Sequence, residues 1–260
     1  MPNLAANFDT IIVGGGHAGC EAYAAACRVG ARACLVLPKI AEAAFQPCNP
    51  AVGGPGKGHL VREVVALGGL MGRVTDESGL QFRTLNARKG PAVRATRVQT
   101  DSGIYSNTME SSLRELSGGT VLEDRAIGIL WKTVAGRRKI SGVRLERGGD
   151  ISCLSVVIAT GTFLRGALFI GEKRQPGGRL GAAPAVRLAH SLGEMGLPLI
   201  RLKTGTCPRL DGNTIFVDNL EPQYSENPPP FFDPRTRETR LPQLTCYLTY
   251  TGETAHRVVQ

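Results

Sequence analysis

Hydrophobic residues first gather in a short run, Phe8 to Val13, which ends directly at a glycine turn of the form Gly14-x-Gly16-x-x-Gly19. A short apolar run rich in β-branched residues predicts a buried strand. The alanine-rich stretch from Ala18 to Val29 then predicts a helix. A strand, a glycine turn and a helix in this order indicate a dinucleotide-binding unit, with a pyrophosphate at the helix N-terminus.

The next apolar run, Ala33 to Leu37, predicts the second strand of this unit, but Pro38 and Lys39 follow it. The usual unit carries an acidic residue about 20 residues after the glycines, which binds a ribose hydroxyl. Glu42 comes late for that role. The pattern therefore argues against an ordinary NAD dehydrogenase and leaves the group that binds the adenosine ribose open.

Further along the chain, Leu60 to Met71 predicts a short helix that ends at Gly68-Gly69, and Asp101 to Leu116 predicts another. Short strand-like pieces separated by glycine turns then predict a β-meander. These pieces are Val121–Glu123, Ile127–Trp131, Ile140–Arg147 and Ile151–Leu154. Ser155 to Ala159 predicts one more strand, which runs into Thr160-Gly161 beside the first glycine turn.

This order of elements resembles the two-dinucleotide flavoprotein fold of the glutathione reductase type. The fold class is therefore α/β, an FAD/NAD(P)-binding Rossmann-like fold with a β-meander. After a helix at 182–193 and Pro198 the composition changes, with a basic stretch at 201–209, a proline-rich stretch at 227–230 and a strand-like run at 241–250. We predict an FAD-binding domain over residues 1–200 and the start of an inserted domain over residues 201–260.

The composition is that of a globular protein of 260 residues, with 42% apolar residues and apolar runs too short to cross a membrane. The first seven residues have no basic start and no apolar core, so we expect no signal peptide. Seven cysteines without a C-x-x-C pair indicate reduced thiols, rather than disulfides or a metal site. These features favour a cytoplasmic protein.

The net charge of +9, from 31 basic and 22 acidic residues, favours an acidic partner, with nucleic acid the leading candidate. General solubility is the alternative explanation. Arg83 to Arg97 carries five cations and no acid, and Gly90-Pro91 predicts a loop there. Such a loop either contacts phosphates or is an ordinary solvated face, and the sequence leaves both open.

Cys48 is the thiol that the sequence singles out, because Pro47 and Pro50 confine it to a shaped loop. Lys57 and His59 follow closely, and nearby cations favour the reactive thiolate form of a cysteine. A buried, inert thiol is the alternative. The glycines at 53–58 do not match a phosphate-binding P-loop, since Ala51 and Gly58 stand where that motif needs glycine and a hydroxyl. Cys20, Cys27 and Cys34 lie on the first helix and second strand, so we expect them to pack.

Several blocks of the sequence together resemble one family, the tRNA uridine 5-carboxymethylaminomethyl modification enzymes, also called glucose-inhibited division protein A. The blocks that carry the resemblance are Gly14-Gly-Gly-His-Ala-Gly19, Cys48-Asn-Pro-Ala-Val-Gly-Gly, Gly56-Lys-Gly-His-Leu60, Ala66-Leu-Gly-Gly-Leu-Met71, Gln81-Phe-Arg-Thr-Leu-Asn86, Lys89-Gly-Pro-Ala-Val-Arg-Ala-Thr-Arg97, Gly161-Thr-Phe-Leu, Gly178-Arg, Arg201-Leu-Lys-Thr-Gly-Thr206 and Cys246-Tyr-Leu-Thr. The likeness extends from Phe8 to about Thr251.

The resemblance implies an FAD enzyme that takes electrons from NADH. With a GTPase partner it modifies C5 of the wobble uridine of certain tRNAs, with methylene-tetrahydrofolate as carbon donor and glycine or ammonia as amine donor. It also implies a homodimer when full length, and a mitochondrial location in a eukaryote. The flavin-site residues that it implies are Gly14, Gly15, Gly16, His17, Ala18, Gly19, Ile127 and Ala185. Cys48 matches one of two cysteines that the family needs for activity.

The sequence departs from the family pattern at several positions. Ala182 and Ala185 replace an aspartate and a serine near the flavin, Cys207 and Tyr250 replace a proline and a histidine, and Pro47 replaces a serine. The family's chains are also much longer, so we expect a fragment or a shortened paralogue. The second cysteine, the rest of the inserted domain and a helical domain would lie in the remainder.

Three hypotheses follow. The first is the flavin-binding part of that tRNA-modifying enzyme. The second is a truncated flavin-fold protein that acts as a binding or regulatory module without turnover. The third is an unrelated FAD-dependent small-molecule oxidoreductase. Flavin in the purified protein would count against the second, and activity on a small amine or thiol without tRNA would favour the third.

Overall fold

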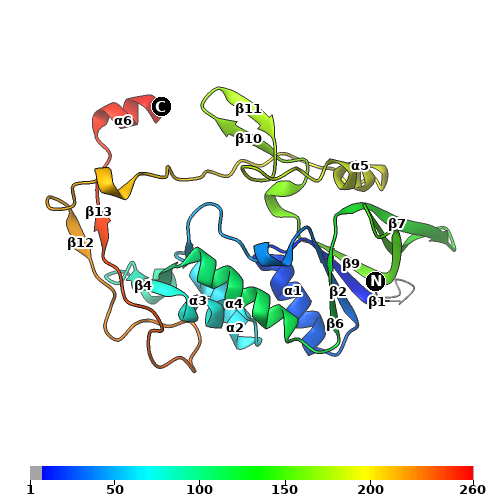
Figure 1. Cartoon of the computed structure of the whole chain (residues 1–260), viewed down its shortest axis with the longest axis horizontal. Coiled ribbons are helices and arrows are strands. Elements are labelled where there is room, and N and C mark those ends of the chain that lie inside the picture. The colour runs from blue at the N-terminus through cyan, green and yellow to red at the C-terminus, as the bar shows by residue number, and fades with distance from the viewer. Residues whose placement is uncertain (1–7, 260) are drawn as a thin grey trace.

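The computed structural model describes residues 8–259, and the first seven residues, where we expected no signal peptide, lie outside it. Its centre is a six-stranded sheet in the order β6-β2-β1-β9-β8-β7 (Figure 1). The strands are β1 (Phe8–Val13), β2 (Ala33–Leu37), β6 (Gly119–Glu123), β7 (Ala126–Val134), β8 (Arg137–Leu145) and β9 (Asp150–Ile158). The first four strands of the order are parallel, and β8 pairs antiparallel with both β9 and β7.

Helices cover both faces of this sheet, so a parallel strand in its middle is apolar throughout. All five residues of β2 are buried. Helix α1 (His17–Arg28) follows β1, and α5 (Val186–Glu194) packs against β7 on the other face. One hydrophobic cluster includes Ile12 and Leu35, and a second, on the opposite face, includes Ile11 and Val36.

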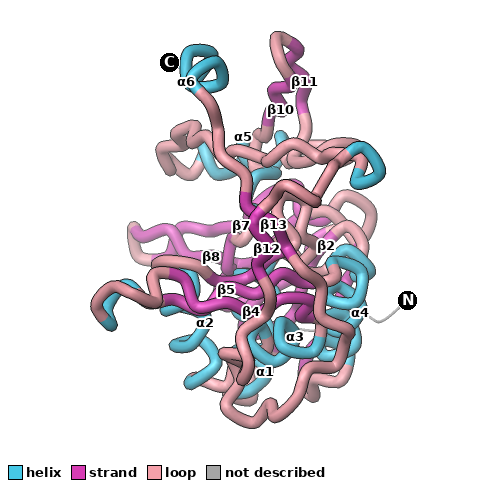
Figure 2. Tube along the Cα trace, turned by 90° about the vertical axis from the view of Figure 1, so that its left-hand side faces the viewer, coloured by secondary structure: helices cyan, strands magenta, loops and turns pink. Residues whose placement is uncertain are grey.

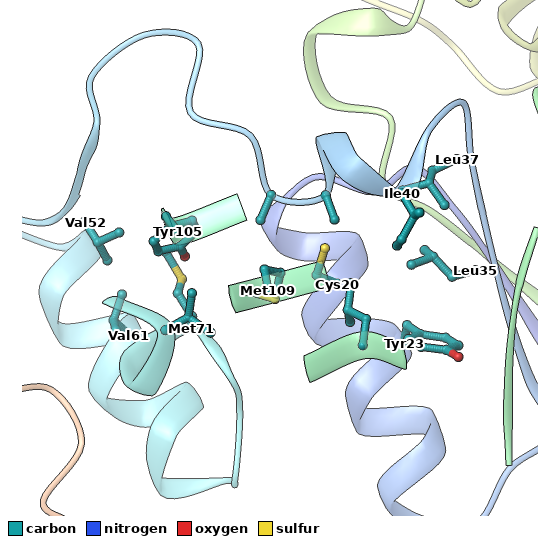
Figure 3. Packing of buried hydrophobic residues seen from close by; sticks show 14 of the residues in the cluster. Cys20, Tyr23, Leu35, Leu37, Ile40, Val52, Val61, Met71, Tyr105 and Met109 are labelled. Carbon is teal, nitrogen blue, oxygen red and sulfur yellow. The ribbon is translucent and has the colours of Figure 1, made fainter. Parts of the chain in front are cut away.

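A smaller antiparallel sheet in the order β3-β5-β4 lies beside the first core. It consists of β3 (Ala51–Gly53), β4 (Gly79–Leu85) and β5 (Ala95–Thr100), with α2 (Lys57–Ala66), α3 (Met71–Glu77) and α4 (Ser102–Arg114) packed around it. Figure 3 shows Cys20 of α1, Met109 and Tyr105 of α4, and Met71 of α3 gathered in one buried cluster. The same cluster includes Leu35 of the large sheet and Phe82 of the smaller one. The dinucleotide-binding sheet and the smaller sheet therefore share one core.

The remaining regular elements are short. They are the hairpin β10 (Ala167–Ile170) and β11 (Lys173–Pro176), the pair β12 (Glu221–Gln223) and β13 (Cys246–Leu248), helix α6 (Glu253–Val259), and the 3-10 turns η1 (Ile40–Glu42), η2 (Pro91–Val93), η3 (Gly161–Phe163) and η4 (Gly212–Thr214). The hairpin and α6 project from one side of the molecule (Figures 1 and 2). Within residues 8–259, no helix has both the length and the hydropathy that a bilayer span requires.

The strand–turn–helix prediction at 8–29, the second strand and the helix after Asp101 are confirmed. Asp101 caps that helix, since its carboxylate accepts hydrogen bonds from the N–H groups of Gly103 and Ile104. The meander prediction needs two corrections. Residues 121–123 belong to β6, which pairs with β2 as a parallel edge strand. Residues 151–154 and 155–159 form one strand, β9, because no glycine or proline interrupts them.

Three further predictions were wrong in detail. Residues 83–97 are not one loop, because β4 and β5 flank the turn at Gly90-Pro91 and pair from Gly79 to Thr100. The helix expected at 60–71 begins at Lys57 and ends at Ala66, and Gly68, with φ +83, reverses the chain before α3. The run at 241–250 forms a strand only over β13.

The chain after α5 runs across the molecule toward β12 and β13 (Figure 1). It packs on the smaller sheet there, where the side chain of Gln81 donates to the carbonyl of Gln223 at 2.6 Å. Phe232 is 1% exposed and belongs to the first hydrophobic core. Asp76 of α3 accepts hydrogen bonds from the N–H groups of Phe232 (3.0 Å) and Asp233 (2.7 Å) and from the hydroxyl of Thr236 (3.1 Å). The division at residue 200 remains a prediction.

Candidate functional site

Two glycines of the first turn are required by the backbone that surrounds them. Gly14 has φ +109, and a Cβ atom there would lie 2.5 Å from the carbonyl oxygen of Ala159. A Cβ atom on Gly19 would lie 1.7 Å from the carbonyl oxygen of Gly14. These contacts let α1 start close to β1, as the spacing predicts. They also confirm that Ala159 and Thr160, directly after β9, lie beside the turn.

The surrounding backbone does not require a glycine at position 16. The φ of −71 at Gly16 suits any residue, and a Cβ atom there would meet no heavy atom within 4 Å. Gly16 is the N-cap of α1, where no side chain caps the helix and no acidic residue stands in the first turn. Unpaired N–H groups at such a terminus attract an anion. The open side of this turn therefore fits the pyrophosphate of a dinucleotide.

His17 follows in the first turn of α1 and points into the protein. Its ring centroid is 5.5 Å from that of Tyr105, and its Nε2 atom is buried with no hydrogen-bond partner among the described residues. Burial, with a smaller effect of the Lys57 charge, lowers the pKa of His17 to about 4. The imidazole is therefore neutral near pH 7, and it can offer a ligand a hydrogen bond without a charge.

The other two predicted flavin-site residues come from the second half of the sheet. Ala185 precedes α5, and its N–H donates to the carbonyl of Phe163 (2.7 Å), in the η3 turn that follows the end of β9. This contact brings Ala185 toward the same end of the sheet as the glycine turn. Ile127 is half-buried on β7, the outer strand, which β9 and β8 separate from β1. Both assignments remain predictions.

The end of β2 carries no carboxylate, as the sequence indicated. Pro38 and Lys39 are exposed there, and the later Glu42 forms an ion pair with Arg179 at 2.6 Å. The Arg179 guanidinium also lies 4.6 Å from the ring centroid of Phe45. Glu42 is thus engaged in holding the Arg179 segment over the 40–45 turn, which is a sufficient structural reason for its presence.

Cys48 lies half-buried in a loop that a distant segment, residues 205–209, crosses. The Sγ of Cys48 donates to the carbonyl of Gly205 at 3.3 Å. The guanidinium of Arg209 donates to the carbonyl of Cys48 at 2.6 Å. The cations expected from the sequence are directed elsewhere. Lys57 Nζ donates to the carbonyl of Ala51, and His59 lines a pocket with Arg62. Arg209 was missed because it is 161 residues away in the sequence.

The cysteines on α1 and β2 pack in the core, as predicted. Cys20 and Cys34 are fully buried, and burial raises the pKa of each thiol to about 12. Burial also raises the pKa of Cys27. These thiols are protonated and shielded from solvent at neutral pH, whereas Cys48 is only half-buried.

A basic pocket of about 210 Å³ lies between α2 and β5. Arg62 and Arg94 line it together with His59, whose ring nitrogens are buried and unpartnered within residues 8–259. Arg62 donates to the hydroxyl of Thr96 (2.8 Å), and Arg94 donates to the carbonyl of Lys89 (2.9 Å). Neither arginine forms an ion pair with a carboxylate in the described part of the chain. The pocket is therefore suited to an anion.

The parallel sheet, the open glycine turn and the antiparallel strands beside β9 define an FAD-binding Rossmann-type α/β protein. Comparison with known proteins narrows this class, because the family described as Glucose inhibited division protein A matches residues 9–260. The chain belongs to that family. Two solved structures of Aquifex aeolicus GidA superpose on 99% and 98% of this chain, with TM-scores of 0.90 and 0.89 at 37% and 38% identity.

Relatives with assigned names agree with the family. The chain is 43% identical over 253 residues to the tRNA uridine 5-carboxymethylaminomethyl modification enzyme MnmG of Geobacter sulfurreducens. It is 43% identical over 256 residues to the enzyme of that name from Granulibacter bethesdensis. Each alignment covers at least 97% of this chain and 40% of the relative. The chain thus spans about 40% of the length of the relatives that it matches.

Proposed function

We propose that this chain is the FAD-binding part of an enzyme that adds a carboxymethylaminomethyl or aminomethyl group at C5 of the wobble uridine of tRNA. The observation that carries the proposal is the open turn at Gly16, within a chain whose relatives are named for tRNA uridine modification. The turn offers a dinucleotide site, and the relatives' name gives the substrate class. NADH as electron donor, a GTPase partner, a homodimer and a cytoplasmic location are parts of the same proposal.

The residues of the turn would hold FAD through its pyrophosphate. Gly14 and Gly19 keep α1 against β1, and the space beside Gly16 at the uncapped start of α1 stays open. Ile127 and Ala185 would hold more distant parts of the cofactor. FAD, when bound, supplies reversible two-electron transfer. The protein's own contribution at this end of the sheet is binding and orientation.

Cys48 is proposed as the nucleophile toward the uridine. Its Sγ must first release the carbonyl of Gly205, while Arg209 continues to hold the Cys48 carbonyl and so fixes the loop. The thiolate then forms a bond to C6 of the uracil ring, and the electron pair of the C5–C6 double bond moves to C5. No group leaves in this step. C5 becomes nucleophilic, and later loss of the C5 proton and of the sulfur restores the double bond.

The basic pocket of Arg62 and Arg94 would bind a phosphate of the tRNA backbone. Phosphate contacts make affinity fall as salt rises, by a slope of about one counterion per contact. We expect Arg94→Ala to weaken the binding of different tRNAs equally and to reduce that slope by about 1. Arg114→Ala is the matched control, because Arg114 is paired with Glu110 at 2.8 Å on α4.

The experiment has two parts on the same protein. Flavin absorbance of the purified chain, or its titration with FAD, tests the cofactor site, and filter binding of tRNA at several salt concentrations tests the pocket. A chain that takes up no FAD would overturn the cofactor assignment. Binding of tRNA that is independent of salt, or unchanged in Arg94→Ala, would overturn the phosphate site.

A further inference from the structure

Two cysteines that are 159 positions apart in the sequence meet on the surface of the molecule. Cys207 lies in the segment that crosses the Cys48 loop, and its Sγ is 4.0 Å from the carbonyl oxygen of Cys48 and 2.8 Å from Oδ1 of Asn49. Cys48 Sγ reaches back to Gly205, two residues before Cys207. Each thiol thus contacts the segment that carries the other.

The two segments are held in this arrangement by a charged side chain. Arg209, two residues after Cys207, donates from its guanidinium to the Cys48 carbonyl at 2.6 Å. The crossing is therefore fixed on one side of Cys207 by the Gly205 contact and on the other by Arg209. A disulfide requires Cα atoms about 4.4 to 6.8 Å apart. The Cys207 thiol lies 4.0 Å from the carbonyl oxygen of Cys48, so the two cysteines are neighbours in space, and rotation of their side chains can bring the two sulfur atoms together.

Cys48 and Cys207 are also more accessible to solvent than most of the other cysteines. Cys207 is exposed and Cys48 is half-buried, whereas four of the other free cysteines are buried. Those four are Cys20, Cys27, Cys34 and Cys153. Cys246 is half-buried too, and burial raises the pKa of its thiol. Oxidation selects thiols that the oxidant can reach.

We propose that Cys48 and Cys207 form a reversible intramolecular disulfide when the protein meets a peroxide. The thiolate of one cysteine attacks a peroxide oxygen, the O–O bond breaks, and a sulfenic acid forms with release of one water. The second thiol attacks that sulfur, the new S–S bond forms, and a second water leaves. Two thiols are oxidised by two electrons, and the peroxide is reduced to two molecules of water.

Asn49 positions the second thiol for this step. Its side-chain oxygen accepts the hydrogen bond of Cys207, so the sulfur is held beside the Cys48 backbone rather than in open solvent. The disulfide would withdraw Cys48 from nucleophilic chemistry and protect it from irreversible oxidation. This consequence for activity rests on the proposed function, whereas the cross-link itself does not.

The test is oxidation of the purified full chain with one equivalent of hydrogen peroxide, followed by alkylation, tryptic digestion and mass spectrometry without reductant. Trypsin releases Cys48 in the peptide Ile40–Lys57 and Cys207 in the peptide Thr204–Arg209, and each peptide contains a single cysteine. We expect these two peptides to appear joined and to separate after dithiothreitol. Of the seven thiols, two should become unreactive toward Ellman's reagent in denaturant and return on reduction.

Two variants make the test specific. Cys207→Ser should abolish the joined peptides and leave Cys48 as a sulfenic acid, which dimedone labels, whereas Cys246→Ser should behave as the parent chain. Absence of the joined pair in the parent chain, a link through Cys246, or a link between two chains on a non-reducing gel would each overturn the proposal. The readout needs neither FAD nor tRNA, so its failure is distinct from a failure of the proposed function.

Discussion

The glycine turn allows binding and folding to be separated by two substitutions of the same size. Gly16→Ala adds a methyl group where a Cβ atom meets nothing within 4 Å, and Gly19→Ala adds one 1.7 Å from the carbonyl oxygen of Gly14. The first methyl group points into the space that we assign to the pyrophosphate. The second pushes α1 away from β1. We therefore expect the Gly16 variant to bind FAD more weakly and the Gly19 variant to be less stable.

The size of each effect follows from the geometry. Gly16 has φ −71 and ψ 177, which alanine adopts without strain, so the free energy of unfolding of the apoprotein should stay constant or rise by about 0.4–1 kcal/mol. Loss of one charge-assisted hydrogen bond to phosphate costs about 1.5–3 kcal/mol. That cost corresponds to roughly a 10- to 100-fold weaker FAD affinity. For Gly19→Ala, overpacking against a backbone atom costs about 1–3 kcal/mol or more.

Thermal unfolding of the apoproteins, with and without added FAD, measures both quantities. At a protein size of 150–250 residues about 1 kcal/mol shifts Tm by roughly 2–4 °C, so Gly19→Ala should lower the apoprotein Tm by several degrees. Added FAD should raise the Tm of the parent chain, and at the same concentration it should raise that of Gly16→Ala by less. The reasoning fails if Gly16→Ala lowers the apoprotein Tm as much as Gly19→Ala does, or if it binds FAD with the parental affinity.

Three further predictions concern buried groups. Asp76→Ala should cost about 1–3 kcal/mol for each buried N–H that it leaves without an acceptor, those of Phe232 and Asp233, measured by urea unfolding. The pKa of His17 is about 4 in the folded protein and 6.5 in the unfolded chain, so the unfolded chain binds more protons between these values and the free energy of unfolding rises with pH there. Burial raises the pKa of Asp76 to about 6, so at this residue the folded protein binds more protons, which opposes the rise. The stability difference between the parent chain and His17→Asn should therefore change by up to about 3 kcal/mol over that window, and a flat difference would contradict the His17 pKa. Cys48 should react with iodoacetamide at least tenfold faster than buried Cys20, by mass spectrometry of the labelled peptides, and equal rates would contradict its exposure.

Local sequence patterns predicted the dinucleotide-binding unit in full and the rest of the fold only in part. From Phe8 to Leu37 every element follows from hydrophobic pattern and glycine chemistry, because the contacts join neighbouring segments. The smaller sheet was missed because its strands carry arginines at Arg83 and Arg97, which gave that stretch the polarity of a loop. Both residues lie on a β4–β5 ladder whose apolar members, Phe82 and Val98, face the core.

The surroundings of Cys48 could not be predicted for a different reason. Lys57 and His59 are close to Cys48 in the sequence, and the prediction assumed from this that their side chains are also close to the thiol in space. In the structure β3 and the N-terminus of α2 turn these side chains away, and the Cys48 carbonyl receives Arg209 instead. Contacts between segments more than 150 residues apart depend on how the chain returns after α5, and no local pattern encodes that path.

The return path itself explains why Cys48 and Cys207 meet. After α5 the chain runs from the large sheet toward the smaller one (Figure 1), and it is anchored at both ends. At the near end Arg201 donates to the carbonyl of Arg165 at 3.1 Å, and at the far end Asp76 holds the N–H groups of residues 232 and 233. The stretch between these anchors passes over the Cys48 loop. Within that stretch Arg209 holds the crossing through the Cys48 carbonyl, so Arg209→Ala should slow the cross-link between Cys48 and Cys207 although neither thiol has changed.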